Sequence, residues 1–192
     1  MESVNEIRSL LVVDLEATCS DDDSVPKHEM EIIEIGAVLV EPAGLQPVGE
    51  FQSFVRPGLH PRLTGFCTGL TTIRQSDVDA APRFPEVLKR FATWAWHTGP
   101  VLFASWGVYD RHQLRADCAR HGQRYPFGSG HLNLKTAFTA AHGLKKKPGL
   151  ADALAVAGLE LRGTHHRGID DARNTARLLP GIRPALAHGV EG

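Results

Sequence analysis

The sequence predicts an α/β protein in which a mixed β-sheet is flanked by helices. Near the N-terminus, two apolar segments are separated by a turn rich in proline and glycine, which is typical of a β-hairpin. Later in the chain, segments with apolar residues at helical spacing alternate with a short apolar run, an order typical of parallel strands joined by helices. A hairpin and parallel connections within one sheet make that sheet mixed.

Four segments are expected to form strands. The first is a short apolar run rich in β-branched residues, as in a buried strand. Pro42, Gly44 and Pro47 mark the turn that joins the second strand to the third. The four expected strands are Ser9–Leu15, Glu31–Glu41, Glu50–Val55 and Val101–Ala104.

Four helices are expected as well. In the first of them, apolar residues such as Phe84, Val87 and Phe91 recur every three or four positions. Gly99-Pro100 ends this helix, and Pro180-Gly181 ends the last one. The four expected helices are Phe84–Trp96, Tyr109–His121, Leu150–Ala157 and Asp170–Leu179.

Length and composition favour one globular domain. The chain has 192 residues, 42% hydrophobic and 22% charged, which suffices for one core and is not typical of disorder or a coiled coil. We expect a single domain over residues 1–192, with its core over about residues 9–180. No segment is apolar enough to cross a membrane. The three cysteines are odd in number and far apart, as is typical of reduced thiols in a cytoplasmic protein.

Charge is distributed unevenly along the chain, although the formal net charge is only −1. Residues 1–102 carry 8 basic and 15 acidic side chains, a net of −7, whereas residues 103–192 carry 13 basic and 7 acidic ones, a net of +6. This asymmetry is either ordinary surface variation or a basic flank beside an acidic centre. The second arrangement would suit a polyanionic substrate.

Asp14 and Glu16, at the end of the first expected strand, are the strongest local feature. Strand side chains alternate, so the two carboxylates face the same side, with their Cα atoms roughly 6–7 Å apart. Neighbouring carboxylates repel, and a divalent cation such as Mg²⁺ or Mn²⁺, which favours oxygen ligands, would stabilise them. The alternative is a strand end that faces solvent.

Further acidic positions could join this pair. Asp110 opens the helix after Val101–Ala104, where it is either a first-turn acid that stabilises the helix or a further ligand. His166 precedes the last helix and Asp171 lies in its first turn, so an imidazole and a carboxylate could share one pocket. Alternatively, this segment is a surface loop in which Asp170 caps the helix.

Taken in order, these residues resemble the DEDDh exonucleases, the DnaQ-like branch of the ribonuclease H-like superfamily. The matching residues are Asp14, Glu16, Asp110, His166 and Asp171. Longer segments resemble the subfamily of histone-mRNA 3′ exonucleases and KapD-like proteins: DLEATC (14–19), EIIEIGAVLV (31–40), FQSFVRP (51–57), FCTGLTTIRQSDVDAAPRF (66–84), SWGVYDRHQL (105–114) and HRGIDDARNTARLL (166–179). The resemblance implies a ribonuclease H-like three-layer fold, with a five-stranded mixed sheet flanked by helices.

The resemblance also implies an activity: metal-dependent 3′–5′ hydrolysis of single-stranded nucleic acid, RNA in preference to DNA, to nucleoside 5′-monophosphates. Two divalent cations, Mg²⁺ or Mn²⁺, would be held by Asp14, Glu16, Asp110 and Asp171. His166 would act as the general base, and Glu16 would share proton handling. The family's spacing from the histidine selects Asp171 over Asp170 as the last ligand.

Contacts to the terminal nucleotide are implied in the same way. The backbone around Ala17 and the rings of Phe66 and Trp106 would hold the terminal base, a stacking contact of ~1–3 kcal/mol per base. For both aromatic residues the alternative is ordinary core packing. Thr18 would either contact the sugar or hold the turn after the strand. Lys145–Lys147 would contact the phosphate backbone or form a solvated loop.

Two other functions stay open. One is a DNA proofreading-type exonuclease subunit, which would bind a polymerase and prefer mismatched duplex ends. The other is a non-catalytic regulatory protein on the same fold, which would bind its partner without a metal. All five catalytic positions carry chemically competent side chains, and pure binding would not need them.

Overall fold

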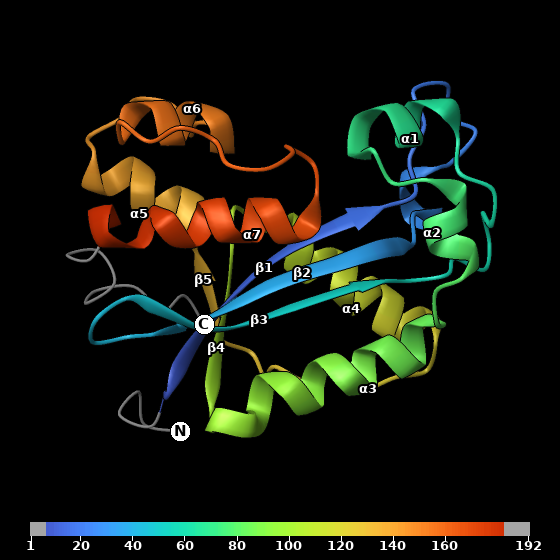
Figure 1. Ribbon diagram of the computed structural model, residues 1–192, viewed down its shortest axis with the longest axis horizontal. Coiled ribbons are helices and arrows are strands. Elements are labelled where there is room, and N and C mark those ends of the chain that lie inside the picture. The colour runs from blue at the N-terminus through green and yellow to red at the C-terminus, as the bar shows by residue number, and fades with distance from the viewer. Residues whose placement is uncertain (1–6, 183–192) are drawn as a thin grey trace.

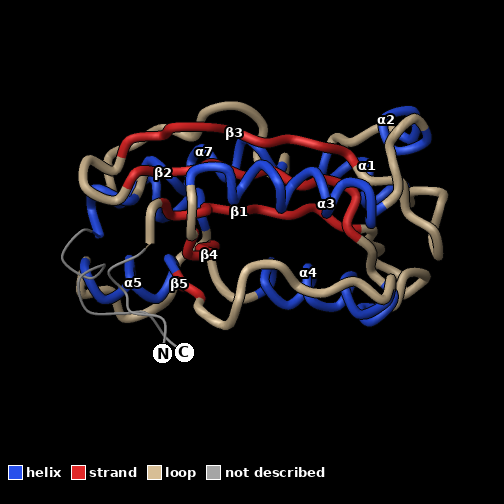
Figure 2. Tube along the Cα trace, turned by 90° about the horizontal axis from the view of Figure 1, so that it is seen from below, coloured by secondary structure: helices blue, strands red, loops and turns tan. Residues whose placement is uncertain are grey.

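A single five-stranded sheet forms the centre of the computed structural model, which describes residues 7–182. The strands are β1 (Ser9–Ala17), β2 (Ile32–Glu41), β3 (Gln46–Phe54), β4 (Val101–Ser105) and β5 (His131–Asn133). They lie in the order β3-β2-β1-β4-β5, one below the other in Figure 2. The pairs β1–β2 and β2–β3 are antiparallel, whereas β1–β4 and β4–β5 are parallel. The expected mixed sheet is confirmed.

Helices cover both faces of this sheet, as Figure 1 shows. One face is covered by α5, α6 and α7, and the other by α3 and α4, while α1 and α2 lie beyond the C-terminal end of β1. The helices are α1 (Gly65–Thr71), α2 (Gln75–Asp79), α3 (Phe84–Ala95), α4 (Tyr109–Arg120), α5 (Leu134–Ala141), α6 (Leu150–Val156) and α7 (Gly168–Arg177). The result is three layers: helices, sheet, helices.

The alternation of side chains along β1 divides the core between the two faces. Leu10 and Val12 pack with residues of α5, α6 and α7, whereas Leu11, Val13 and Leu15 pack with residues of α3 and α4. A strand that is apolar on both faces must be buried on both. The even-numbered series continues past Val12 into Asp14 and Glu16, so the polar end of the strand faces α7.

Several elements differ from the sequence-based expectation. The strand β5 and the helices α1, α2 and α5 were not expected, and their lengths of three to eight residues give little periodicity to detect. The strand β3 begins at Gln46 and includes Pro47, which was expected in the turn. An edge strand tolerates proline, and a register shift lies between its partners Leu39 and Val40. The helix α7 begins at Gly168, two residues before its expected start.

Two further observations concern the cysteines and the helices. Cys19, Cys67 and Cys118 are all free thiols. Between residues 7 and 182, no helix combines the length and the apolarity that crossing a membrane requires.

Candidate active site

The candidate site lies where β1 ends and where α4 and α7 begin. In Figure 1 the arrowhead of β1 reaches the space between α7 and α1. Asp14 and Glu16 come from β1, Asp110 from the first turn of α4, and Asp171 from the first turn of α7. Acidic side chains are favoured in the first turn of a helix because its unpaired N–H groups carry partial positive charge.

Folding brings these carboxylates together from three parts of the chain. Oxygen atoms of Asp14, Glu16 and Asp171 all lie within 4.8 Å of one another. The fourth carboxylate, that of Asp110, accepts a hydrogen bond from the backbone N–H of Leu15 at 3.0 Å, which fixes it against the strand between Asp14 and Glu16. We refer to these four residues as the acidic cup.

Burial and mutual repulsion raise the pKa values of the acidic cup. Burial, followed by the charges of its neighbours, raises the pKa of Asp14 well above its usual range and that of Glu16 to about 8. Burial raises the pKa of Asp110 to about 6 against the opposing effect of the Leu15 hydrogen bond, and burial also raises the pKa of Asp171. Burial therefore disfavours the ionised form of these carboxyl groups, and a cation close by would favour it.

Divalent cations fit this donor set. The cup offers only carboxylate oxygens, which suit Mg²⁺ and Mn²⁺. A cation placed among them would offset the repulsion that raises their pKa values. The arrangement has the chemistry of a divalent metal site.

Two adjacent histidines flank Asp171. Its Oδ2 atom accepts hydrogen bonds from Nδ1 of His165 at 2.9 Å and from the backbone N–H of His166 at 2.9 Å. The two imidazole rings stack with their centroids 4.0 Å apart. Partial burial, together with the charge of His165, lowers the pKa of His166. The backbone of His166 has a φ of 62°, in the left-handed region that non-glycine residues seldom adopt.

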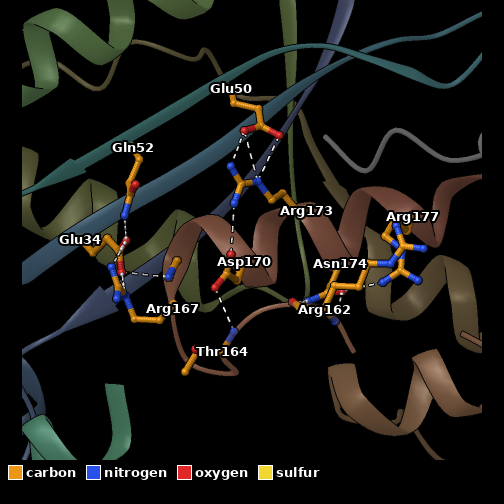
Figure 3. Close-up of polar contacts among 11 residues, drawn as sticks. Glu34, Glu50, Gln52, Arg162, Thr164, Arg167, Asp170, Arg173, Asn174 and Arg177 are labelled. Atoms are coloured by element: carbon orange, nitrogen blue, oxygen red, sulfur yellow. Dashed lines mark hydrogen bonds and ion pairs between the residues drawn. The ribbon is translucent and has the colours of Figure 1, made fainter. Parts of the chain in front are cut away.

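The structure separates Asp171 from its neighbour Asp170. The carboxylate of Asp170 accepts a hydrogen bond from the backbone N–H of Thr164 at 2.9 Å and pairs with Arg173 at 3.2 Å, as Figure 3 shows. Asp171 instead shares the cup with Asp14 and Glu16. Asp170 is thus held by the loop and by its own helix.

Two glycines let the start of α7 approach the sheet. A Cβ atom on Gly36, the partner of Asp14 in the β1–β2 ladder, would lie 2.0 Å from the backbone carbon of Gly168. A Cβ atom on Gly168 would lie 3.1 Å from the carbonyl oxygen of Asp14. Since only glycine permits such an approach, these two residues set how close Asp171 comes to β1.

The chain after Glu16 is fixed by Thr18. A register shift in the β1–β2 ladder lies between Glu16 and Ala17, where β1 ends. Beyond it, Thr18 is buried; its N–H donates to the carbonyl of Glu31 at 2.8 Å, and its Oγ1 accepts from the N–H of Glu31 at 2.9 Å. These contacts fit the second role considered for Thr18, that of holding the turn. Both Ala17 and Thr18 are buried.

The two candidate stacking residues differ in their surroundings. Phe66, on α1, is 41% exposed, so part of its ring can be reached from solvent. Trp106 is partly buried: its ring packs against Phe138 with centroids 5.6 Å apart, and its Nε1 donates to the carbonyl of Pro148 at 3.3 Å. Lys145–Lys147 lie exposed in the loop between α5 and α6.

Sequence reasoning missed Glu34 and Arg167. Glu34 is fully buried on β2, opposite Glu16, and its carboxylate pairs with Arg167 at 3.0 Å. A signal was available, because Glu34 is a charged residue within the otherwise apolar run EIIEIGAVLV. A buried carboxylate requires a partner, but that partner lies 133 residues away in the sequence.

The carboxylates gathered at the end of the central strand form a candidate metal centre, and two-metal centres are used by nucleases, phosphatases and polymerases. The chain belongs to the exonuclease family (RNase_T), which matches residues 11–179. Among its relatives are ERI1 exoribonuclease 2 of Homo sapiens, 33% identical over 88% of this chain and 27% of the relative, and ERI1 exoribonuclease 3 of Homo sapiens, 34% identical over 88% and 52%. This chain thus spans about a quarter to a half of the length of these curated relatives.

Solved structures agree. The nuclease domain of 3′hExo, a DEDDh family member bound to rAMP, is 27% identical, with a TM-score of 0.83 over 97% of both chains. A 3′-exonuclease described in the 3′-end-specific recognition of the histone mRNA stem-loop is also 27% identical, with a TM-score of 0.81 over 95% of this chain and 65% of that one. The expected DEDDh family and ribonuclease H-like fold are confirmed, and residues 11–179 match the exonuclease family.

Proposed function

We propose that this protein is a divalent-metal-dependent 3′–5′ exonuclease that degrades single-stranded nucleic acid, RNA in preference to DNA, to nucleoside 5′-monophosphates. The observation that carries the proposal is the gathering of Asp14, Glu16 and Asp171 within 4.8 Å, with Asp110 fixed beside them. The preference for RNA is supported by relatives that are named exoribonucleases and by the rAMP bound to the similar nuclease domain.

Two cations, Mg²⁺ or Mn²⁺, would be held by Asp14, Glu16, Asp110 and Asp171. When bound, they supply charge neutralisation at the phosphate and acidify the attacking water. Four ionised carboxylates carry a charge of −4, which two divalent cations would balance. With both cations bound, the cup would carry a net charge near zero and would not repel a polyanionic substrate. The chain as a whole carries a formal net charge of −1 without cations.

His166 would accept the proton of the attacking water. Its lowered pKa keeps the imidazole neutral at pH 7, the form that can accept a proton. Glu16, whose carboxylate lies within 4.8 Å of that of Asp171, would share this proton handling while it holds a cation. His165, bonded to Asp171 through Nδ1, would orient that carboxylate.

The terminal nucleotide would lie against the backbone at Ala17, with Phe66 and Trp106 beside its base. The exposure of Phe66 supports this role, because a ring that is free on one side can stack on a base. Thr18 would act indirectly, by holding the strand end against Glu31. We infer further that residues 9–180 act as one domain, because both apolar clusters share one sheet. The three free thiols favour action in the cytoplasm.

The test is degradation of matched RNA and DNA oligonucleotides, each labelled at the 5′ or the 3′ end, with Mg²⁺, with Mn²⁺ or with chelator. We expect a 3′ label to be released at once as a mononucleotide, a 5′ label to pass through a ladder of shortening products, and RNA to be consumed faster. Chelator should stop both. The absence of turnover on every strand would contradict the proposal, and metal-independent binding without turnover would favour the regulatory binding protein.

A further inference from the structure

Glu34 is a buried carboxylate beside the acidic cup that is saturated by protein donors. It accepts hydrogen bonds from Nε and Nη2 of Arg167 at 3.0 and 3.3 Å, from the backbone N–H of Gly168 at 3.0 Å and from Nε2 of Gln52 at 2.6 Å. Figure 3 shows these groups converging on it. A carboxylate has about four acceptor sites, so none is left for a cation. Glu34 therefore has a different task from that of its cross-strand partner Glu16.

We propose that Glu34 and Arg167 are positioning residues that hold His166 in its catalytic conformation. This inference rests on the proposed function, because it assigns the pair to the general base of that reaction. We call the contacts of Glu34 with Arg167 and Gly168 the clamp. Arg167 and Gly168 are the two residues that follow His166, so the clamp grips the chain directly beside it.

The backbone of His166 needs such support. Its φ of 62° lies in the left-handed region, which strains a non-glycine residue and persists only where the surroundings fix it. On one side, the N–H of His166 is bonded to Asp171. On the other side, the clamp fixes the side chain of Arg167 and the peptide N–H of Gly168. His166 is therefore held from both directions in a conformation that it would otherwise leave.

The clamp also supplies the cap that α7 lacks. Arg167 is the N-cap residue of α7, and its side chain makes no capping hydrogen bond. The N–H of Gly168, the first of the unpaired donors at the start of the helix, is bonded instead to Glu34 of β2. A carboxylate at this position is stabilised by the helix dipole. The start of α7, and with it Asp171, is thereby tied to the central sheet.

Strand β3 completes the arrangement. Besides the bond from Gln52, the guanidinium of Arg167 lies over the ring of Phe54, 5.2 Å from its centroid. Arg167 is only 23% exposed in its side chain, and Glu34 is not exposed at all. A buried pair of this kind depends on its geometry, and the planar, forked guanidinium of arginine provides that geometry better than lysine does.

The same helix offers a matched control. Arg173 pairs with Glu50 of β3 at 2.6 Å and with Asp170, but both members of the Arg173–Glu50 pair are about half exposed. It thus joins α7 to the sheet as Arg167 does, but farther along the helix, as Figure 3 shows. If the clamp acted only through the attachment of α7, loss of either arginine would have a similar effect.

The test uses steady-state kinetics on single-stranded RNA with Mn²⁺ for four variants: Arg167→Ala, Arg167→Lys, Arg173→Ala and the double variant Glu34→Leu/Arg167→Met. We expect Arg167→Ala to lower kcat by roughly 10–100-fold while KM changes less than about 3-fold. Arg167→Lys should recover part of the loss, and Arg173→Ala should stay near the wild-type value. The double variant guards against misfolding, because apolar replacement of both partners of a buried pair commonly preserves stability. It should fold and show the same loss of kcat.

A second readout does not need turnover. The imidazole NMR signals of His166, assigned with His166→Gln, should shift in Arg167→Ala and in the double variant but not in Arg173→Ala. The clamp is disproved if these signals stay in place, or if folded clamp variants keep the kcat of Arg173→Ala. An inactive wild-type protein would instead contradict the proposed function, and the NMR comparison would still decide whether the clamp positions His166.

Discussion

Asp171 accepts a hydrogen bond from the backbone N–H of His166 at 2.9 Å, so the two ends of the HRGIDD motif are joined within the site. A main-chain donor does not depend on which side chain residue 166 carries. Substitution of His166 should therefore remove the imidazole and leave the Asp171 carboxylate in place. This separation makes the roles of the two residues testable one at a time.

The adjacent histidines should differ in their effect on turnover. We expect His166→Ala to lower kcat by ~10²–10⁴-fold, the range for loss of a general base. His165→Ala removes one hydrogen bond to Asp171 from a side chain that is 38% exposed, so its loss should stay below ~10-fold. Single-turnover rates on a 5′-labelled RNA strand would measure both. A reversed order of the two losses would transfer the general-base role to His165.

The adjacent aspartates should differ as well. Asp171→Asn removes a charge from the acidic cup and is expected to lower activity by more than ~100-fold, above the usual cost of losing an outer-shell partner of a metal ligand. Asp170→Asn alters a group bonded to Thr164 and Arg173, and should change activity less than ~3-fold. The same RNA assay, with folding checked by circular dichroism, compares them. Equal losses would contradict the assignment of Asp171 as the ligand.

Without divalent cations, the acidic cup should make the protein less stable as pH rises. Burial and neighbouring charges raise the pKa of Glu16 from 4.5 to about 8, so between these values the folded state binds more protons than the unfolded state. Stability due to this group is full below pH 4.5 and is lost as pH rises through 8. We expect the Tm in chelator to fall over this interval and Mn²⁺ to restore more of it at pH 8 than at pH 5.

The variant Glu16→Gln provides the control for this titration. It cannot ionise, so its Tm in chelator should fall less steeply from pH 5 to pH 8 than that of the wild-type protein. Subtracting the two curves removes the contributions of groups that do not interact with Glu16. Parallel curves for the two proteins would contradict a raised pKa at Glu16.

Close packing at the start of α7 predicts that replacing Gly36 by a larger residue destabilises the protein. Gly36→Ala would place a Cβ atom 2.0 Å from the backbone of Gly168, and we expect it to lower the free energy of unfolding by about 3 kcal/mol or more. Gly69, within α1, has no atom within 4 Å of its Cβ position, so Gly69→Ala should leave the protein as stable or raise its stability by up to about 1 kcal/mol. Urea unfolding measures both. Similar midpoints for the two variants would show that α7 does not depend on this contact.

The sequence predicted much of the fold because its signals are local. The alternation from Leu10 through Glu16 correctly placed Asp14 and Glu16 on one face, and the apolar spacing around Phe91 correctly located α3. By contrast, β5 has three residues, too few for a pattern, and the parallel partner that orders it, β4, lies well before it in the chain. Such elements depend on tertiary contacts that a local pattern cannot contain.

The candidate site, like the fold, could be predicted from the sequence only in part. The family resemblance selects Asp171 over Asp170 through its spacing from His166. In the structure, Asp171 lies with Asp14 and Glu16, whereas Asp170 is bonded to Thr164. The clamp was missed, because the pairing of Glu34 with Arg167 requires both the β1–β2 register and the place where α7 begins. The sequence does not reveal the hydrogen bonds between Thr18 and Glu31, because they join two segments that are separate in the chain. Residues that position others can be recognised only from their tertiary contacts, which the sequence does not show.

Anomalous diffraction from crystals grown with Mn²⁺ and a nucleoside 5′-monophosphate tests most directly whether the four carboxylates form one cation site. We expect two manganese peaks, separated by ~3.5–4 Å, among Asp14, Glu16, Asp110 and Asp171, with the phosphate in contact with them. Crystals with the nucleotide bound but no manganese in the acidic cup, or with manganese held elsewhere, would contradict the account.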